Sequence, residues 1–192
     1  VLSLGVFYPL LQNKKLLQSD SMQYLGMSRQ LQESRKATGE ELYWVDNAYG
    51  GMPTYQLGAK YPADILTPIH KVFRLLPHPA FLLFLYFLGA YVFLCALALP
   101  KRYAVLGALA YGLSTYLLII LQVGHNTKAQ ALGYLPFVFA GMHYVFTKKH
   151  LLGFLLSTLA MALQIRANHY QMTYSMLLLM RVYFGVMLLK EY

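Results

Sequence analysis

The chain has few charged residues and one cysteine. Charged side chains make up 12% of its 192 residues, about half the share found in a soluble globular domain. This shortage argues against a soluble enzyme domain and, together with a mean hydropathy of +0.45, predicts a membrane protein. Cys95 has no second cysteine to pair with, so an internal disulfide is excluded and the redox compartment cannot be inferred from it.

Acidic residues are scarce beyond the first third of the chain. Six of the seven lie between positions 20 and 64, and only Glu191 follows Asp64. A catalytic carboxylate in this chain must therefore come from the first third. The net charge of +9 fits contacts with anionic lipid and phosphate. No soluble basic domain is present, so nucleic acid is not a predicted partner.

Long apolar runs predict transmembrane helices, since a spanning helix needs about 20 mostly apolar residues. Short connections between the later runs predict antiparallel neighbours. The first run is about half a span and has no initiator Met, so we expect the chain to be a fragment of a longer protein with a truncated first helix. The predicted spans are 1–11 (partial), 80–99, 103–122, 129–146, 151–165 and 172–189.

Basic residues in alternate turns predict which face is cytoplasmic. Lys101-Arg102, Lys148-Lys149-His150 and Lys190 fall on one side of the predicted bundle. The long loop 12–78 and the polar turns after the second complete and fourth complete spans then lie on the extracytoplasmic side.

The long outer loop has two predicted amphipathic helices. Residues 21–37 place Tyr24, Met27 and Leu31 on one face, and residues 63–76 repeat apolar residues at helical spacing. We expect the second helix to lie in the membrane interface, with a kink at Pro68. Its basic side, which faces the headgroups, is formed by His70, Lys71 and Arg74.

Asp20 is the first candidate for chemistry. It follows the first apolar run, in the cluster Gln18-Ser19-Asp20. A carboxylate at a partly desolvated membrane edge can act as a general base. The alternative is that Asp20 or an adjacent serine caps the following helix. Asp46 is a secondary candidate base, for which a structural role in the Gly50-Gly51 turn is the alternative.

A second polar cluster begins one predicted span. His125, Asn126 and Lys128 follow Gly124, where the N-terminus of a helix favours an anion. We therefore predict that these residues bind phosphate or substrate. The alternative is ordinary loop polarity with a lysine that extends toward the headgroups.

A third cluster connects the last two spans. Arg166 is the better bidentate partner for phosphate, and Asn168, His169 and Gln171 are predicted to contact the same substrate. The alternative for Arg166 is a structural anchor at a helix end.

Metal binding by Asp20, His125 and His169 is a further alternative. The sequence has no pair of histidines at the i, i+4 spacing of a zinc helix. We therefore assign no metal ligands and predict no cofactor, while a divalent metal remains an alternative without support from a motif.

Several short motifs occur in a defined order along nearly the whole chain. Each is weak alone, but together they resemble the N-terminal part of YfhO-type bacterial multipass membrane proteins. The motifs are Gln18-Ser19-Asp20, Gly39-Glu40-Glu41 with Trp44, Gly50-Gly51-Met52-Pro53-Thr54-Tyr55-Gln56, Gly124-His125-Asn126-Thr127-Lys128-Ala129 and Ala167-Asn168-His169-Tyr170-Gln171.

That family is similar to GT-C glycosyltransferases, and the resemblance implies a fold and an activity. The fold is an all-α multipass membrane bundle, with residues 1–192 as the N-terminal part of its transmembrane domain. The implied activity is sugar transfer, at the outer face of the bacterial cytoplasmic membrane, from a polyprenyl-phosphate donor to a glycan, lipid or protein acceptor. The family's catalytic acid matches Asp20, although Ser21 follows it where some members have a second acid, and no Asp-x-Asp motif occurs.

Two non-enzymatic functions remain open. One is transport of a lipid-linked glycan, for which interrupted spans would be typical. The other is that of an accessory subunit that binds a partner through the polar loops.

Overall fold

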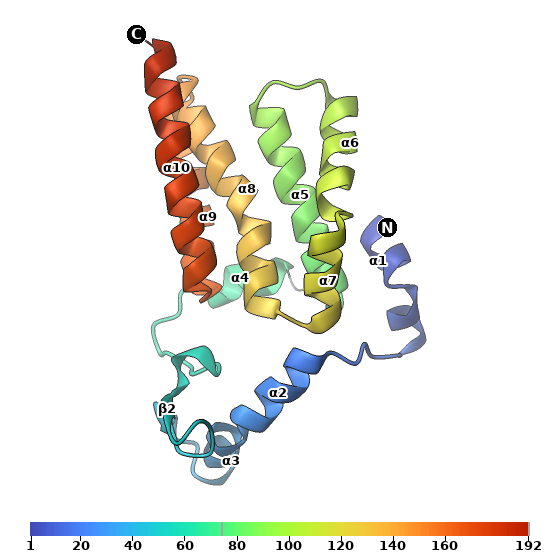
Figure 1. Cartoon of the computed structure of the whole chain (residues 1–192), viewed down its shortest axis with the longest axis vertical. Helices are drawn as coiled ribbons and strands as arrows, with labels where there is room; N and C mark the ends of the chain where they lie inside the picture. The colour runs from blue at the N-terminus through green and yellow to red at the C-terminus, as the bar shows by residue number, and fades with distance from the viewer. Residues whose placement is uncertain (74, 192) are drawn as a thin grey trace.

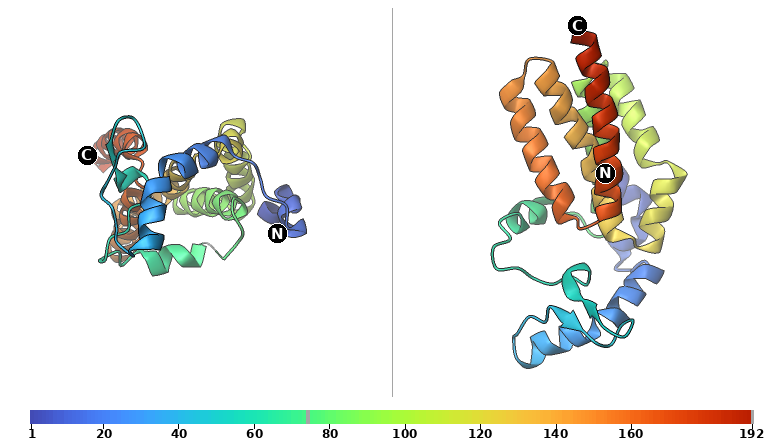
Figure 2. Two further views of the ribbon diagram at one scale, coloured as in Figure 1. Left: turned by 90° about the horizontal axis from the view of Figure 1, so that it is seen from below. Right: turned by 60° about the vertical axis from the view of Figure 1, so that its left-hand side comes forward.

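The computed structural model describes residues 1–73 and 75–191, and in these the chain is mostly helical. A helical bundle forms one part, and an outer segment lies beyond one of its ends (Figure 1). The C-terminus lies at the opposite end of the bundle (Figures 1 and 2). The all-α class predicted from the sequence is therefore confirmed at this coarse level.

Short connections join the bundle helices, and successive helices run antiparallel except α6 and α7, which follow one another in the same general direction (Figure 1). The central helix is α8, which packs against α5 on one side and α9 on the other. The bundle consists of α5 (Ala80–Ala96), α6 (Lys101–Gly112), α7 (Thr115–Val123), α8 (Asn126–Phe146), α9 (His150–Arg166) and α10 (Tyr170–Glu191).

The predicted span 103–122 is wrong as one continuous helix. It is divided into α6 and α7, whose axes differ by 48°. Gly112 ends α6 against Phe87, and Ser114 adopts an extended conformation before α7. The span predicted at 80–99 ends earlier, at Ala96, and the one predicted at 129–146 begins three residues earlier, at Asn126.

Length and composition identify fewer membrane-crossing elements than the six predicted spans. Within the described residues, Tyr170–Leu189 is long and apolar enough to cross a bilayer, with a mean hydropathy of 1.6. The bent pair α6 and α7 would add a second element if it formed one broken span. Helices α5 and α9 are apolar but have 17 residues each. The multipass arrangement therefore stays a prediction.

Small residues bring the bundle helices close together. A Cβ added to Gly141 of α8 would lie 2.5 Å from the backbone nitrogen of Ser157 on α9. A Cβ on Gly89 of α5 would lie 2.7 Å from the carbonyl oxygen of Gly133 on α8. Close-packed interiors do not absorb such overlaps cheaply. The glycines therefore set the spacing of α5, α8 and α9, which fixes the positions of their ends.

The outer segment has less regular structure than the bundle. Its hairpin pairs Trp44 with Pro53 and Val45 with Met52. Its elements are α2 (Ser19–Met27), α3 (Arg29–Ala37), β1 (Trp44–Val45), β2 (Met52–Pro53), η2 (Thr54–Gln56) and α4 (Thr67–Phe73). The partial span predicted at 1–11 is instead the short helix α1 (Leu2–Val6), which packs beside α5, followed by the 3-10 helix η1 (Tyr8–Gln12).

The helix predicted at 21–37 is broken at Ser28, between α2 and α3. Its predicted apolar face is nevertheless used. Leu31 is fully buried with Val45 and Leu57, and Met27 packs against them. We call residues 19–64, which surround this small core, the outer module.

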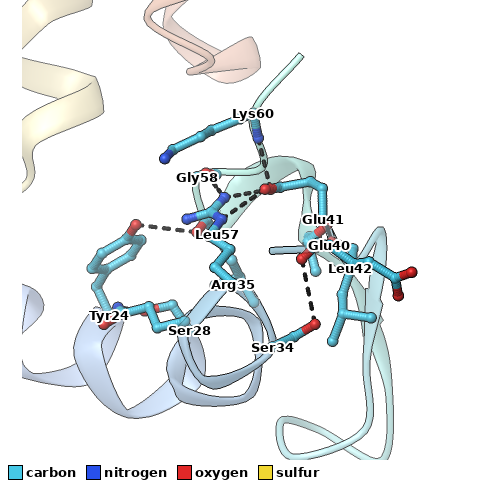
Figure 3. A network of polar contacts seen from close by, with 12 residues as sticks. Tyr24, Ser28, Ser34, Arg35, Glu40, Glu41, Leu42, Leu57, Gly58 and Lys60 are labelled. Carbon is cyan, nitrogen blue, oxygen red and sulfur yellow. Dashed lines mark hydrogen bonds and ion pairs between the residues drawn. The ribbon is translucent and has the colours of Figure 1, made fainter. Parts of the chain in front are cut away.

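Polar contacts close the outer module around its core (Figure 3). Arg35 forms an ion pair with Glu41 and donates a hydrogen bond to the carbonyl oxygen of Gly58. The Tyr24 hydroxyl donates to the carbonyl oxygen of Leu57 at 3.1 Å. These contacts tie α2 and α3 to the chain on both sides of the hairpin.

The helix predicted at 63–76 is shorter in the structure, and its orientation differs. Pro68 lies in the first turn of α4, where the missing N–H is tolerated, so it produces no kink. His70, predicted to face the headgroups, is buried and bonded to the Tyr134 hydroxyl at 3.2 Å. Ile65 and Val72, by contrast, are exposed. The predicted role of Arg74 lies outside the described residues.

Candidate functional site

The three predicted polar clusters occur at the same end of the bundle. The C-termini of α7 and α9 and the N-termini of α8 and α10 lie there, next to the outer segment (Figure 1). The basic connections before α6 and before α9 lie at the other end. The two ends of the bundle therefore differ in chemistry, and the candidate site is at the end that carries the outer segment.

Asp20 and His125 form the central contact of this end. Asp20 is in the first turn of α2, and His125 precedes α8. The Asp20 Oδ2 atom is buried and lies 2.5 Å from His125 Nδ1, an ion-pair contact that lacks hydrogen-bond alignment. The Asp20 side chain is 27% exposed and that of His125 is 50% exposed. Because Nδ1 faces the carboxylate, Nε2 is the imidazole nitrogen left for a ligand.

A buried glutamine fixes α2 against the bundle. Gln18 Nε2 donates to the carbonyl oxygen of Leu121 at 2.7 Å, and Ser21 Oγ donates to Gln18 Oε1 at 3.0 Å. The Leu121 carbonyl is in the last turn of α7, where carbonyl groups have no N–H partner within the helix. Gly124, with φ of 89°, allows the chain to turn directly beneath Gln18. This docking places Asp20 at the beginning of α8.

The N-terminus of α8 carries further polar groups. The Asn126 Oδ1 atom lies 2.6 Å from His78 Nε2, a contact that sequence reasoning missed. Lys128 Nζ lies 5.3 Å from the centre of the Tyr116 ring, a cation–π distance. The free N–H groups and the dipole of this 21-residue helix add partial positive charge. An anion is the ligand that this environment favours.

His169 belongs to the same electrostatic environment. Its Nδ1 accepts a hydrogen bond from the backbone N–H of Met172 at 3.3 Å, which caps the start of α10. Burial lowers the pKa of His169, and repulsion from the nearby Lys128 ammonium lowers it further. The neutral imidazole therefore predominates at neutral pH, and His169 acts as a cap and a neutral hydrogen-bonding group here.

Arg166 already has a matched partner. Its Nη2 lies 3.0 Å from Asp64 Oδ2, and the same nitrogen donates to Thr67 Oγ1 at 2.9 Å. The Arg166 hydrogen bond lowers the pKa of Asp64. Arg166 thus ties the start of α4 to the end of α9. The structural-anchor alternative describes this arrangement better than the predicted phosphate contact.

Asp64 and Thr67 were not among the predicted site residues. The sequence contained one signal for Asp64: it is the last acid before Glu191, so a cation near the middle of the chain had few acidic partners. No spacing rule identified Arg166 as that cation, because the two residues are 102 positions apart.

The remaining candidates lie at the margin of the cluster or away from it. Asn168, with φ of 59°, donates to the carbonyl oxygen of Tyr55 at 2.6 Å and so joins the α9–α10 turn to the outer module. Gln171 is exposed in the first turn of α10. Asp46 accepts a hydrogen bond from the Trp44 indole in the hairpin, which matches the turn alternative rather than a base beside His125.

Within residues 1–73 and 75–191, the structure groups no three His, Cys, Asp or Glu side chains around a common position. Asp20 and His125 form a contact of two residues.

Comparisons with known proteins add no family. No protein-family model matches the chain, no curated protein matches it, and no solved structure matches its fold. The resemblance to YfhO-type proteins therefore remains an expectation based on the motifs.

Proposed function

We propose that the bundle lies in the bacterial cytoplasmic membrane, with the Asp20–His125 end outside the cytoplasm. Apolar side chains that face outward support this, since a soluble helix would present polar groups there. In the apolar window of α10 only 6% of the residues are buried inside the structure. Leu151, Phe154 and Leu155 of α9 are likewise exposed. The basic connections at the other end fit the cytoplasmic side.

The proposed activity is transfer of a sugar from a polyprenyl-phosphate donor to an extracytoplasmic acceptor. An acceptor hydroxyl attacks the anomeric carbon while the bond from that carbon to the phosphate oxygen breaks. The bonding electron pair leaves with the phosphate, and the hydroxyl proton passes to the enzyme. The observation that carries this proposal is the Asp20–His125 contact beside the N-terminus of α8, which combines a proton acceptor with a site for an anion.

The burial of Asp20 Oδ2 changes the roles expected for Asp20 and His125 in proton transfer. Because this oxygen faces His125 Nδ1, Asp20 acts with His125 as a pair. The proton enters at His125 Nε2, and Asp20 orients the ring and stabilises the imidazolium that forms. From the sequence, Asp20 alone was predicted to accept the proton, and His125 was predicted to orient the substrate.

The leaving phosphate is assigned to the N-terminus of α8. Backbone N–H groups and Lys128 stabilise the charge that develops there, and Asn126 and His169 contact the sugar or the phosphate as hydrogen-bonding groups. Arg166 has its charge matched by Asp64. Its role is to hold α4 across the end of the bundle.

Substitution of the pair tests this proposal. Asp20→Asn and His125→Gln, in protein reconstituted with a radiolabelled polyprenyl-phosphate sugar, should each reduce transfer by about 10²–10⁴-fold. Glu33→Gln is the matched control, because Glu33 is exposed and its ion pair is with Arg29, one turn earlier on the same helix. Transfer by Asp20→Asn at the rate of Glu33→Gln would remove Asp20 from the mechanism.

A second candidate function is transport of the same lipid-linked glycan. The break between α6 and α7 favours it, because interrupted helices are typical of transporter binding sites. In the same reconstituted vesicles, a transporter would move the labelled lipid between leaflets and leave the sugar–phosphate bond intact. Product formation would favour the transferase.

A further inference from the structure

A hollow in the outer module lies between α2 and the tip of the hairpin. It is a shallow hollow, largely open to solvent, with a volume of about 460 Å³. It combines amide groups with apolar side chains, and none of the described residues that line it is charged. The residues that line it are Gln23, Gly26, Met27, Asn47, Ala48 and Tyr49.

The hairpin that forms one wall is held firmly. Gln30 Oε1 on α3 accepts the backbone N–H of Asp46 at 2.8 Å, and Asn47 Nδ2 donates to the carbonyl oxygen of Gly26 on α2 at 3.2 Å. Val45 is fully buried in the core of the module. The wall is therefore ordered before any ligand arrives, which reduces the entropic cost of binding.

Two aromatic rings are exposed on this hairpin. Tyr49, which lines the hollow, is 87% exposed, and Trp44 is 54% exposed. The Trp44 indole lies against Gly51, where a Cβ would come within 2.8 Å of the ring. Its N–H donates to Asp46 at 3.0 Å. One face of the indole therefore packs against backbone, and its N–H is already hydrogen-bonded. A ligand can contact the opposite face of the ring.

The charge of the module identifies the class of ligand. Residues 19–64 contain six acidic and four basic residues, a net charge of −2 in a chain that carries +9. Anionic lipid headgroups and phosphates are therefore disfavoured here. Amides and an aromatic face without cations suit a neutral, polyhydroxylated ligand: hydroxyls bond to the amides, and the C–H face of a sugar ring stacks on the aromatic ring.

We propose that this hollow and the hairpin aromatics bind a neutral oligosaccharide. The binding itself is independent of the proposed transfer reaction, since neither Tyr49 nor Trp44 belongs to the Asp20–His125 pair. A second part of the proposal, which rests on the proposed function, is that the hollow binds the acceptor of that reaction. Asp20 and Gly26 lie on the same helix, about 9 Å apart along its axis, so a chain bound in the hollow extends toward the pair as its acceptor.

The fluorescence of Trp44 tests the proposal directly, because it is the chain's only tryptophan. The purified protein in detergent is titrated with cellotetraose, maltotetraose and chitotetraose. At least one should change the emission saturably, and Tyr49→Ala should weaken that binding about tenfold, the loss of one aromatic contact. Tyr43→Ala is the matched control, because this exposed ring stacks with Tyr61 at 6.0 Å and does not line the hollow.

Three outcomes would overturn the proposal. They are no saturable change with any of the three tetrasaccharides, equal weakening by the two tyrosine variants, and quenching of Trp44 by brominated lipid in vesicles, which would place the ring in the membrane interface. Because no turnover is measured, failure here leaves the transferase proposal standing, and loss of activity in Asp20→Asn leaves this one standing.

Discussion

Gly124→Ala tests whether the turn between α7 and α8 holds Asp20 against His125. With φ of 89°, an alanine there adopts a left-handed conformation that costs about 1–2 kcal/mol. The new Cβ would lie 2.7 Å from Gln18 Cβ and 2.8 Å from Ser21 Oγ, so α2 must move. Breaking the buried Gln18 hydrogen bond costs about 1–3 kcal/mol more. We expect the free energy of unfolding to fall by about 2–5 kcal/mol.

The assay is thermal unfolding in detergent, followed by circular dichroism, together with limited proteolysis at residues 13–17, which precede α2. Gly26→Ala is the matched control: it changes the same residue type within α2, where a Cβ meets nothing within 4 Å, and should gain about 0.5–1 kcal/mol. Equal melting temperatures and equal proteolysis of the two variants would refute the docking of α2 through Gly124.

Two further predictions concern the anchor and the bundle. Arg166 lowers the pKa of Asp64 below its ordinary value of 3.8, so the pair contributes stability above that value and loses it as the pH falls through the folded pKa. The native chain should exceed Asp64→Asn in unfolding free energy by at most about 1 kcal/mol, because the pair is partly exposed. This difference should disappear as the pH falls from about 5 to about 2. A difference that does not depend on pH would contradict the ion pair. Gly141→Ala should destabilise the bundle by about 1–3 kcal/mol, because its Cβ meets the Ser157 backbone. The control is Gly185→Ala, where a Cβ meets nothing within 4 Å, and this variant should gain up to about 1 kcal/mol. Equal melting temperatures of the two variants would refute the close packing of α8 and α9.

The helical part of the fold was largely predictable from apolar runs, but the ends and breaks of its helices were not. Hydropathy could not detect the break at Gly112–Ser114, because the residues on both sides are apolar. Pro68 was predicted to kink a helix that in fact begins at Thr67. Capping and local packing, which act over one turn, determine such boundaries.

The candidate site was also only partly predictable from the sequence. The polarity of His125 and its neighbours, between apolar runs, was sufficient to select them. The pairing of Arg166 with Asp64 was not predictable, since no local rule relates residues 102 positions apart. The same holds for His78 with Asn126, 48 positions apart.

The sequence by itself determined that the chain is helical, and that its acids are confined to the first third while its basic and imidazole groups recur in the later turns. Local composition sets these properties, because apolar periodicity and the order of residues need no knowledge of distant contacts. Only the tertiary structure decided that Asp20 meets His125, that Arg166 is held by Asp64, and that α2 presents both the pair and the hollow. The physical reason is that these contacts depend on how closely the helices approach and where they end, which small residues such as Gly124 and Gly141 fix through packing.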